Sequence, residues 1–186
     1  MYEKKENDKM DELAEIARNA IILAEFLLIP IVICTFFNAV NITKIVYMRG
    51  SFNEYSLELT SMALKGYVIG LPFLALRDIV TRVYYSYSDT KTPVIINMIS
   101  VIINIVLDFI LGYTWGVMGI TMATSAANIF SGVCMCLFIK KYNKEIMDKK
   151  IIREIIILIL SGVISSLICH WGVTYSGSTW LIVIMT

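Results

Sequence analysis

An aspartate inside a long apolar run is the residue of this sequence best suited to chemistry. Asp108 follows Asn104 by one helical turn, so both side chains project from the same face of a helix. Thr124, in the next apolar run, can add a hydroxyl oxygen. A carboxylate in hydrocarbon needs a proton or a cation, and hard cations such as sodium prefer oxygen ligands. The three residues predict a cation or proton site. The alternative is a protonated Asp108 in an interhelical hydrogen bond, worth about 0.6 kcal/mol.

Other charged residues also lie within apolar runs. Arg77 and Arg82 are five residues apart, Asp78 follows Arg77, and Glu25 lies in an earlier run. A charge in hydrocarbon costs about 2.5–3.5 kcal/mol on insertion scales, so such side chains usually face a cavity or reach the headgroups. Two interpretations of the arginines stay open. Arg77 and Arg82 line a substrate path, or they extend to the headgroups while Asp78 neutralises a neighbour.

The usual parts of an enzyme active site are missing from the sequence. It has no Ser/His/Asp set, no paired histidine ligands and no glycine-rich phosphate loop. The single histidine, His170, stands beside Trp171 at the end of an apolar run, which is typical of an anchor at the membrane interface. The cysteines lie in apolar runs without a CxxC pair, so we expect small core residues and no metal or disulfide: Cys34, Cys134, Cys136 and Cys169. We expect a protein that is not an enzyme and has no organic cofactor.

The composition places these residues in a membrane. Hydrophobic residues make up 58% of the chain and charged residues 17%, and the mean hydropathy is +0.73. Soluble domains contain only about 45–50% apolar residues. The net charge of +1 provides no basic field for a nucleic acid. The sequence therefore predicts an all-α, polytopic transmembrane helical bundle with membrane lipid as its partner and no nucleic acid.

Polar turns divide the chain into apolar runs long enough to cross roughly 30 Å of hydrocarbon. Residues 1–18 are polar and form a cytoplasmic lead-in that is unlike a signal peptide. The predicted bundle covers residues 19–171, and its five complete spans run over about 19–48, 57–87, 93–113, 117–139 and 151–171. Residues 172–186 would form an external loop and the start of a truncated sixth span.

Lysines and arginines gather in alternate loops. Lys4, Lys5, Lys9 and Arg18 lie in the lead-in, and six further basic residues lie within 140–153. The loops after the third and fifth predicted spans contain neither lysine nor arginine. Because basic loops stay in the cytoplasm, we expect a cytoplasmic N-terminus.

Several short motifs resemble a known family. In chain order they are Arg49-Gly50-Ser51-Phe52, Gly70-Leu71-Pro72, Tyr84-Tyr85-Ser86-Tyr87-Ser88-Asp89-Thr90-Lys91-Thr92-Pro93, Asn104, and Gly116-Val117-Met118-Gly119-Ile120. From about Ala14 to Lys141 the chain resembles the lipid II flippases of the MurJ/MviN family, and the remainder is similar in hydropathy.

The resemblance implies a fold of fourteen helices in two lobes. This chain would correspond to spans nine to thirteen and the start of the fourteenth, within the C-terminal lobe. Family members move a lipid-linked peptidoglycan precursor across the bacterial plasma membrane by alternating access. Asn104, Asp108 and Thr124 fall where the C-terminal lobe of the family can hold a cation. Residues 151–171 would form one wall of a groove for the lipid tail.

The chain also departs from the family. The arginines that meet the diphosphate of the precursor belong to the N-terminal spans and have no counterpart here. The resemblance therefore implies a C-terminal part that is inactive without a separate N-terminal part. Two alternatives stay open. A related polysaccharide-lipid or drug exporter should lack the DTKTP turn, and a non-transporting membrane scaffold would need no ion site.

Overall fold

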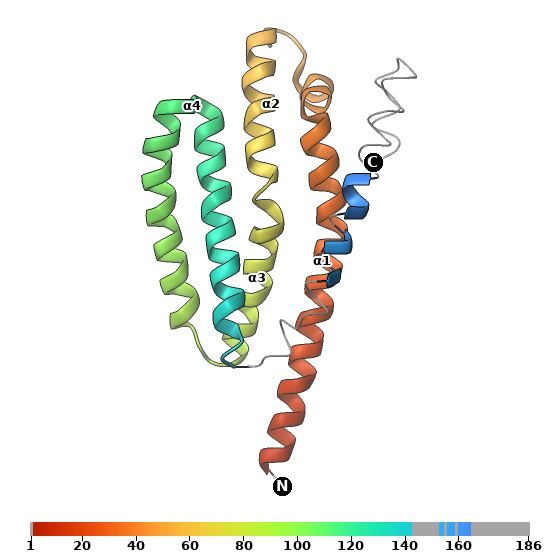
Figure 1. Ribbon diagram of the computed structural model, residues 1–186, viewed down its shortest axis with the longest axis vertical. Helices are drawn as coiled ribbons and strands as arrows, with labels where there is room; N and C mark the ends of the chain where they lie inside the picture. The colour runs from red at the N-terminus through yellow and green to blue at the C-terminus, as the bar shows by residue number, and fades with distance from the viewer. Residues whose placement is uncertain (1, 143–152, 155, 159, 165–186) are drawn as a thin grey trace.

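The computed structural model describes residues 2–142, 153, 154, 156–158 and 160–164. In chain order the labelled helices are α1 (Tyr2–Tyr47), α2 (Glu54–Val68), α3 (Leu71–Ser86) and α4 (Lys91–Ile139). In Figure 1, α2 and α3 form a column between α1 and α4. Over the described residues, three stretches are long and apolar enough to cross a membrane: Glu12–Tyr47, Glu54–Ser86 and Lys91–Ile139. The expectation of an all-helical membrane bundle is confirmed in this form.

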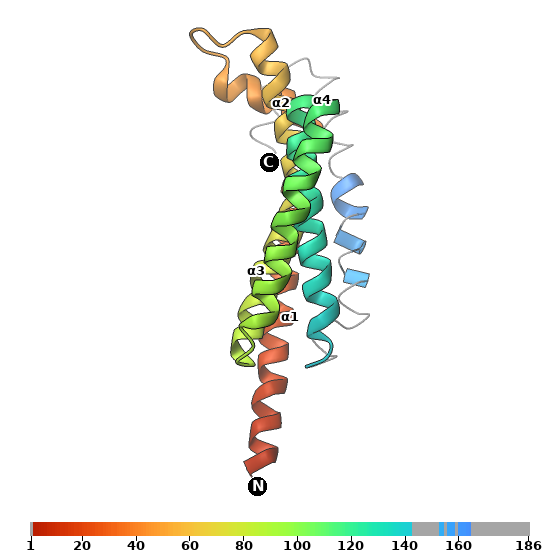
Figure 2. The same ribbon diagram turned by 90° about the vertical axis from the view of Figure 1, so that its left-hand side faces the viewer.

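α1 changes direction at Asn38, where the backbone departs from helical geometry with φ −105° and ψ 17°. The Asn38 side chain is buried, and its Nδ2 donates to the carbonyl oxygen of Cys34 at 3.0 Å. This side-chain donor stabilises the bend, because the backbone bonds are perturbed there. The turns after Asn38 lie across the end of the bundle (Figures 1 and 2). There the ring of Tyr47 stacks on Phe52, with 6.0 Å between centroids.

α2 and α3 form one column with a break between them. The side chain of Asn53 caps α2 by accepting from the backbone nitrogen of Ser56 at 2.8 Å. The helix is interrupted after Val68, and Pro72 in the first turn of α3 has no N–H to satisfy. The break perturbs the carbonyl of Gly66, which accepts from Ser125 Oγ of α4 at 2.5 Å. The break is therefore stabilised by a neighbouring helix.

α4 is a hairpin of two helical arms. Gly116 has φ 58° and ψ −133°, a backbone conformation that favours glycine, and the chain reverses there (Figure 1). Ser100 Oγ in the first arm donates to the carbonyl oxygen of Ala127 in the second at 2.8 Å. Gly119 lies so close to Leu111 that a Cβ would overlap the Leu111 carbonyl. The two arms are therefore in backbone contact near the reversal.

At the opposite end of the hairpin, Asp89 joins its start to its end. Asp89 Oδ1 accepts from the backbone nitrogens of Lys91 and Thr92, both at 3.0 Å. Its Oδ2 accepts from the hydroxyl of Tyr142 at 2.8 Å. The hydrogen bonds from Thr92, and then that from Tyr142, lower the pKa of Asp89 to about 2. Tyr142 also packs edge-on against Tyr84, with ring centroids 5.9 Å apart.

We call the hydrogen bonds of Asp89 with Lys91, Thr92 and Tyr142 the clasp. The core lies in the half of the bundle that contains the clasp. Tyr84 is fully buried, and its hydroxyl donates to the carbonyl oxygen of Met135 at 3.1 Å. The buried cluster joins α1, α3 and α4: Ala14, Ala17, Ile21, Leu76, Val80, Val83, Tyr84, Ile96, Met135, Cys136 and Ile139. Elsewhere large apolar side chains are exposed, including Phe109 and Tyr113 on the first arm of α4. Lipid can cover such surfaces in a membrane-spanning bundle.

Some predicted elements are described in part or not at all. The fifth predicted span, 151–171, is described at 153, 154, 156–158 and 160–164, where the backbone is helical. The predicted external loop and sixth span at 172–186, together with His170 and Cys169, lie outside the described residues. Among the other cysteines, Cys34 and Cys136 are buried and Cys134 is half-buried.

Candidate functional site

The hairpin of α4 brings Asn104, Asp108 and Thr124 together. Asn104 and Asp108 lie one turn apart on the first arm, and Thr124 lies opposite on the second. Asn104 Nδ2 donates to Asp108 Oδ2 at 2.9 Å, and Asn104 Oδ1 accepts from the backbone nitrogen of Thr124 at 3.2 Å. This is the amide orientation in which both ends of the Asn104 side chain have a partner. Asn104 thus forms a second polar link between the arms, beside that of Ser100 with Ala127.

One oxygen of the Asp108 carboxylate, Oδ1, is available to bind a proton or a cation. Oδ1 is buried, and no described residue donates a hydrogen bond to it. A buried carboxylate oxygen without a partner loses its hydration and gains nothing in return. A proton or a cation at this oxygen would restore the missing interaction.

Thr124 takes part through its backbone. Its hydroxyl donates to the carbonyl oxygen of Ile120 in its own helix at 3.2 Å, which is common for threonine within helices. The hydroxyl oxygen keeps acceptor capacity.

The donor set suits a small, hard, singly charged ion or a proton. Asp108 supplies the carboxylate, and Asn104 and Thr124 can supply neutral oxygens. Within the described parts of the chain, no group of three or more His, Cys, Asp or Glu residues could hold a metal ion. A single carboxylate balances only half the charge of a divalent cation. Divalent cations usually bind several oxygen ligands, many of them carboxylates.

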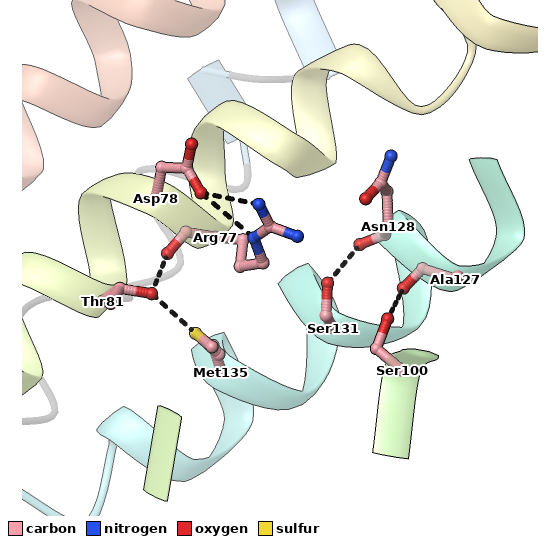
Figure 3. Close-up of polar contacts among 8 residues, drawn as sticks. All are labelled: Arg77, Asp78, Thr81, Ser100, Ala127, Asn128, Ser131 and Met135. Carbon is pink, nitrogen blue, oxygen red and sulfur yellow. Dashed lines mark hydrogen bonds and ion pairs between the residues drawn. The ribbon is translucent and has the colours of Figure 1, made fainter. Parts of the chain in front are cut away.

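The arginines of α3 lie in different surroundings. Arg77 is 24% exposed, and its Nη2 lies 2.9 Å from Asp78 Oδ1. Its carbonyl oxygen accepts from Thr81 Oγ1 at 2.7 Å, and the same hydroxyl lies 3.2 Å from the sulfur of Met135. Figure 3 shows the guanidinium on the side of α3 that faces Asn128 and Ser131 of α4. The ion pair with Asp78 is the neutralisation that one of the two sequence interpretations proposes.

Arg82 is exposed, and none of the described acidic side chains forms an ion pair with it. Neither arginine belongs to the Asp108 site. Arg77 faces the level of Ser131, whereas Asp108 is linked through Asn104 to Thr124. These levels on the second arm are seven residues apart, or roughly 10 Å at 1.5 Å per residue.

The sequence interpretation missed the serines that hold this region together. Ser100 lies one turn before Asn104 and bonds to Ala127, and Ser125 follows Thr124 and bonds to Gly66. Both are buried. The available signal was their spacing, since Ser100, Asn104 and Asp108 recur every four residues along one helical face.

Comparisons with known proteins agree on one family. The model of the family described as "Lipid II flippase MurJ" matches residues 1–185. The lipid II flippase MurJ of Thermosipho africanus is 36% identical over 113 residues, which cover 61% of this chain and 24% of that protein. The probable lipid II flippase MurJ of Rickettsia prowazekii is 28% identical over 173 residues, covering 91% of this chain and 34% of the relative.

A solved structure titled "Lipid II flippase MurJ, inward closed conformation" has a TM-score of 0.84 and 25% sequence identity. The alignment covers 96% of this chain and 37% of the solved chain. This chain therefore spans about a quarter to a third of the length of the curated relatives that it matches.

Proposed function

The chain belongs to the MurJ family of lipid II flippases, and we propose that it forms the C-terminal part of a flippase for a lipid-linked peptidoglycan precursor. On this proposal it works in the bacterial plasma membrane by alternating access, as a transporter. The observation that carries the proposal is the family match over residues 1–185, joined to the backbone likeness to a solved MurJ.

We assign five complete spans and the start of a sixth to the chain, within the C-terminal lobe of a fourteen-helix fold. The break at Gly116 supports separate third and fourth spans, because the two arms of α4 contain 93–113 and 117–139. The column of α2 and α3 supports a second span over 57–87, and α1 contains the first at 19–48. The proposed fifth span is 151–171.

The Asp108 site would couple transport to a sodium ion or a proton. Asp108 Oδ1 is the buried oxygen without a described donor, and this observation supports the fit to a cation. Asn104 could turn its amide oxygen toward the ion by a half rotation about χ2, and Thr124 could add its hydroxyl. Bound there, the ion would neutralise the carboxylate and join the two arms of the hairpin.

We also propose that Arg82 is the better of the two arginine candidates for a substrate path. Arg77 is half-buried and paired with Asp78, so its charge is largely neutralised. Arg82 is exposed near the clasp end of the bundle, where a diphosphate or a lipid headgroup could approach it.

Expressed alone in a bacterium depleted of its own lipid II flippase, the chain should insert into the membrane and fail to restore growth. The reason is that the arginines that would meet the diphosphate belong to the N-terminal spans of the family, and this chain matches only about a quarter to a third of the length of its relatives. Supplying the N-terminal part of a relative together with this chain should restore growth, measured as colony formation. Growth restored by the chain alone would contradict the proposed division of labour, and failure of both would favour a non-transporting scaffold.

A cysteine at the clasp end of α4 should be protected from a membrane-impermeant thiol reagent added to intact cells. The excess of lysine and arginine in the lead-in and beyond Lys140 supports a cytoplasmic location of this end. Lys141→Cys should therefore stay unlabelled, and Thr114→Cys at the opposite end of the hairpin should be labelled. Both positions are exposed. The unsubstituted chain measures the background labelling of its natural cysteines. A reversed labelling pattern would contradict the cytoplasmic location of the clasp end.

A further inference from the structure

Glu25 lies in α1, within a stretch long and apolar enough to cross a membrane, and is only 3% exposed. It lines a cavity of about 190 Å³ between α1 and α3. The other walls are apolar: Ile29, Val32 and Ile33 from α1, and Pro72, Phe73 and Leu76 from α3. The lining of this cavity is apolar throughout, so a buried carboxyl-bearing residue lies beside a space that offers it no polar partner.

No described residue donates a hydrogen bond to Glu25 or forms an ion pair with it. The charged or titratable side chains on the elements packed around this part of α1 are Arg77 and Asp78 of α3, Cys136 and Lys140 of α4, and Arg153 and Glu154 near the end of the described chain. Arg77 is paired with Asp78, and the thiol of Cys136 is the group close enough to interact electrostatically with Glu25. None of the cationic side chains that the structure describes forms an ion pair with Glu25.

An ionised carboxylate buried beside such a cavity is strongly disfavoured, because it loses its hydration and gains no compensating charge or hydrogen bond from the described residues. A sodium ion is poorly suited to remove this cost, because it needs several oxygen ligands and the other residues that line the cavity have apolar side chains. A proton needs one oxygen. Asp108 differs from Glu25, because its Oδ2 accepts a hydrogen bond from the amide of Asn104.

We propose that Glu25 is a proton-binding site and that its neutral, protonated form holds α1 against α3. Loss of the proton would leave a carboxylate that must be hydrated, so water would enter the cavity and the contact of Ile29, Val32 and Ile33 with α3 would loosen. Gly162 packs against Ile29, Pro30 and Ile33, so the contact of residues 160–164 with α1 would loosen as well. A role of this proton in helix movement during transport rests on the proposed flippase function, whereas proton binding itself does not.

Infrared spectroscopy of the whole chain in lipid bilayers tests the proposal. At about pH 7, where a solvated glutamic acid is ionised, the unsubstituted protein should show the carbonyl stretch of a protonated carboxylic acid. Glu25→Gln should remove that band, and so should Glu25→Met, which fills the cavity with an apolar chain. Asp108→Asn and the replacement of choline by sodium should leave the Glu25 band unchanged, which separates this site from the proposed cation site. A spectrum that is the same with and without Glu25 would overturn the proposal.

The melting temperature of the same samples provides a second measurement. The folded state holds a proton on Glu25 that the unfolded chain releases above about pH 5, so stability should fall as the pH is raised further. Glu25→Gln carries no titrating proton, so its melting temperature should lose this part of the pH dependence. Parallel pH profiles of Glu25→Gln and the unsubstituted chain would also overturn the proposal.

Discussion

Asp108→Asn is expected to abolish a rise in melting temperature that sodium produces in the unsubstituted protein. An ion bound at the Asp108 carboxylate stabilises the folded state by mass action, by about 2.7 kcal/mol at a concentration one hundred times the dissociation constant. For a chain of this size that free energy corresponds to roughly 5–10 °C. The asparagine keeps the shape of the side chain and removes the charge that attracts the ion, so the fold should survive while the response to sodium is lost.

Variants of the individual ligands measure how much each ligand contributes to the rise in melting temperature that sodium produces. Asn104→Ala should weaken it less than Asp108→Asn does, because a neutral ligand contributes less to a hard cation than a carboxylate. Thr124→Val keeps the side-chain shape and the backbone nitrogen that contacts Asn104, so it tests the hydroxyl alone. Choline at the same concentration controls for ionic strength. A melting temperature indifferent to sodium in the unsubstituted protein would favour a protonated Asp108 that shares an interhelical hydrogen bond with Asn104.

Gly119→Ala should unfold the α4 hairpin locally and destabilise the whole chain by roughly 3 kcal/mol or more. A Cβ at this position would overlap the carbonyl of Leu111, which is backbone and cannot rotate away. The arms would have to separate, and the contacts from Ser100 to Ala127 and from Asn104 to Thr124 would lengthen. Thermal unfolding in detergent measures the loss, and the sodium response should decrease with it.

Gly112→Ala is the matched control in the same hairpin. Its Cβ would meet Cγ1 of the Ile120 side chain at 3.1 Å and Cδ1 at 3.7 Å, and that side chain can move aside. This substitution should therefore be tolerated far better than Gly119→Ala. Equal stability of the two variants would show that the arms do not approach as closely at Gly119 as the structure has them.

Much of the fold could be predicted because its determinants are local. Length and hydropathy of the apolar runs indicate where helices can cross hydrocarbon, and Pro93 and the polar residues before it indicate the turn between α3 and α4. The pairing of Asn104 with Asp108 is equally local, since a spacing of four residues places two side chains on one helical face. Thr124 adds a hydroxyl to this pair from the next apolar run, the family resemblance supports the same three residues, and the structure brings all three together.

The sequence by itself determined that the chain is a helical membrane protein of this family and which polar residues share a helical face. Tertiary structure alone decided that Ser100 bonds to Ala127, that Ser125 bonds to Gly66, and that Glu25 is buried beside an apolar cavity. The physical reason is that lipid is as apolar as a helix interface, so hydropathy does not distinguish a face packed against protein from one exposed to lipid. α4 is apolar on most of its circumference, and the reversal at Gly116, the close contact at Gly119 and the hydrogen bonds of Ser100 and Ser125 fix which face turns inward.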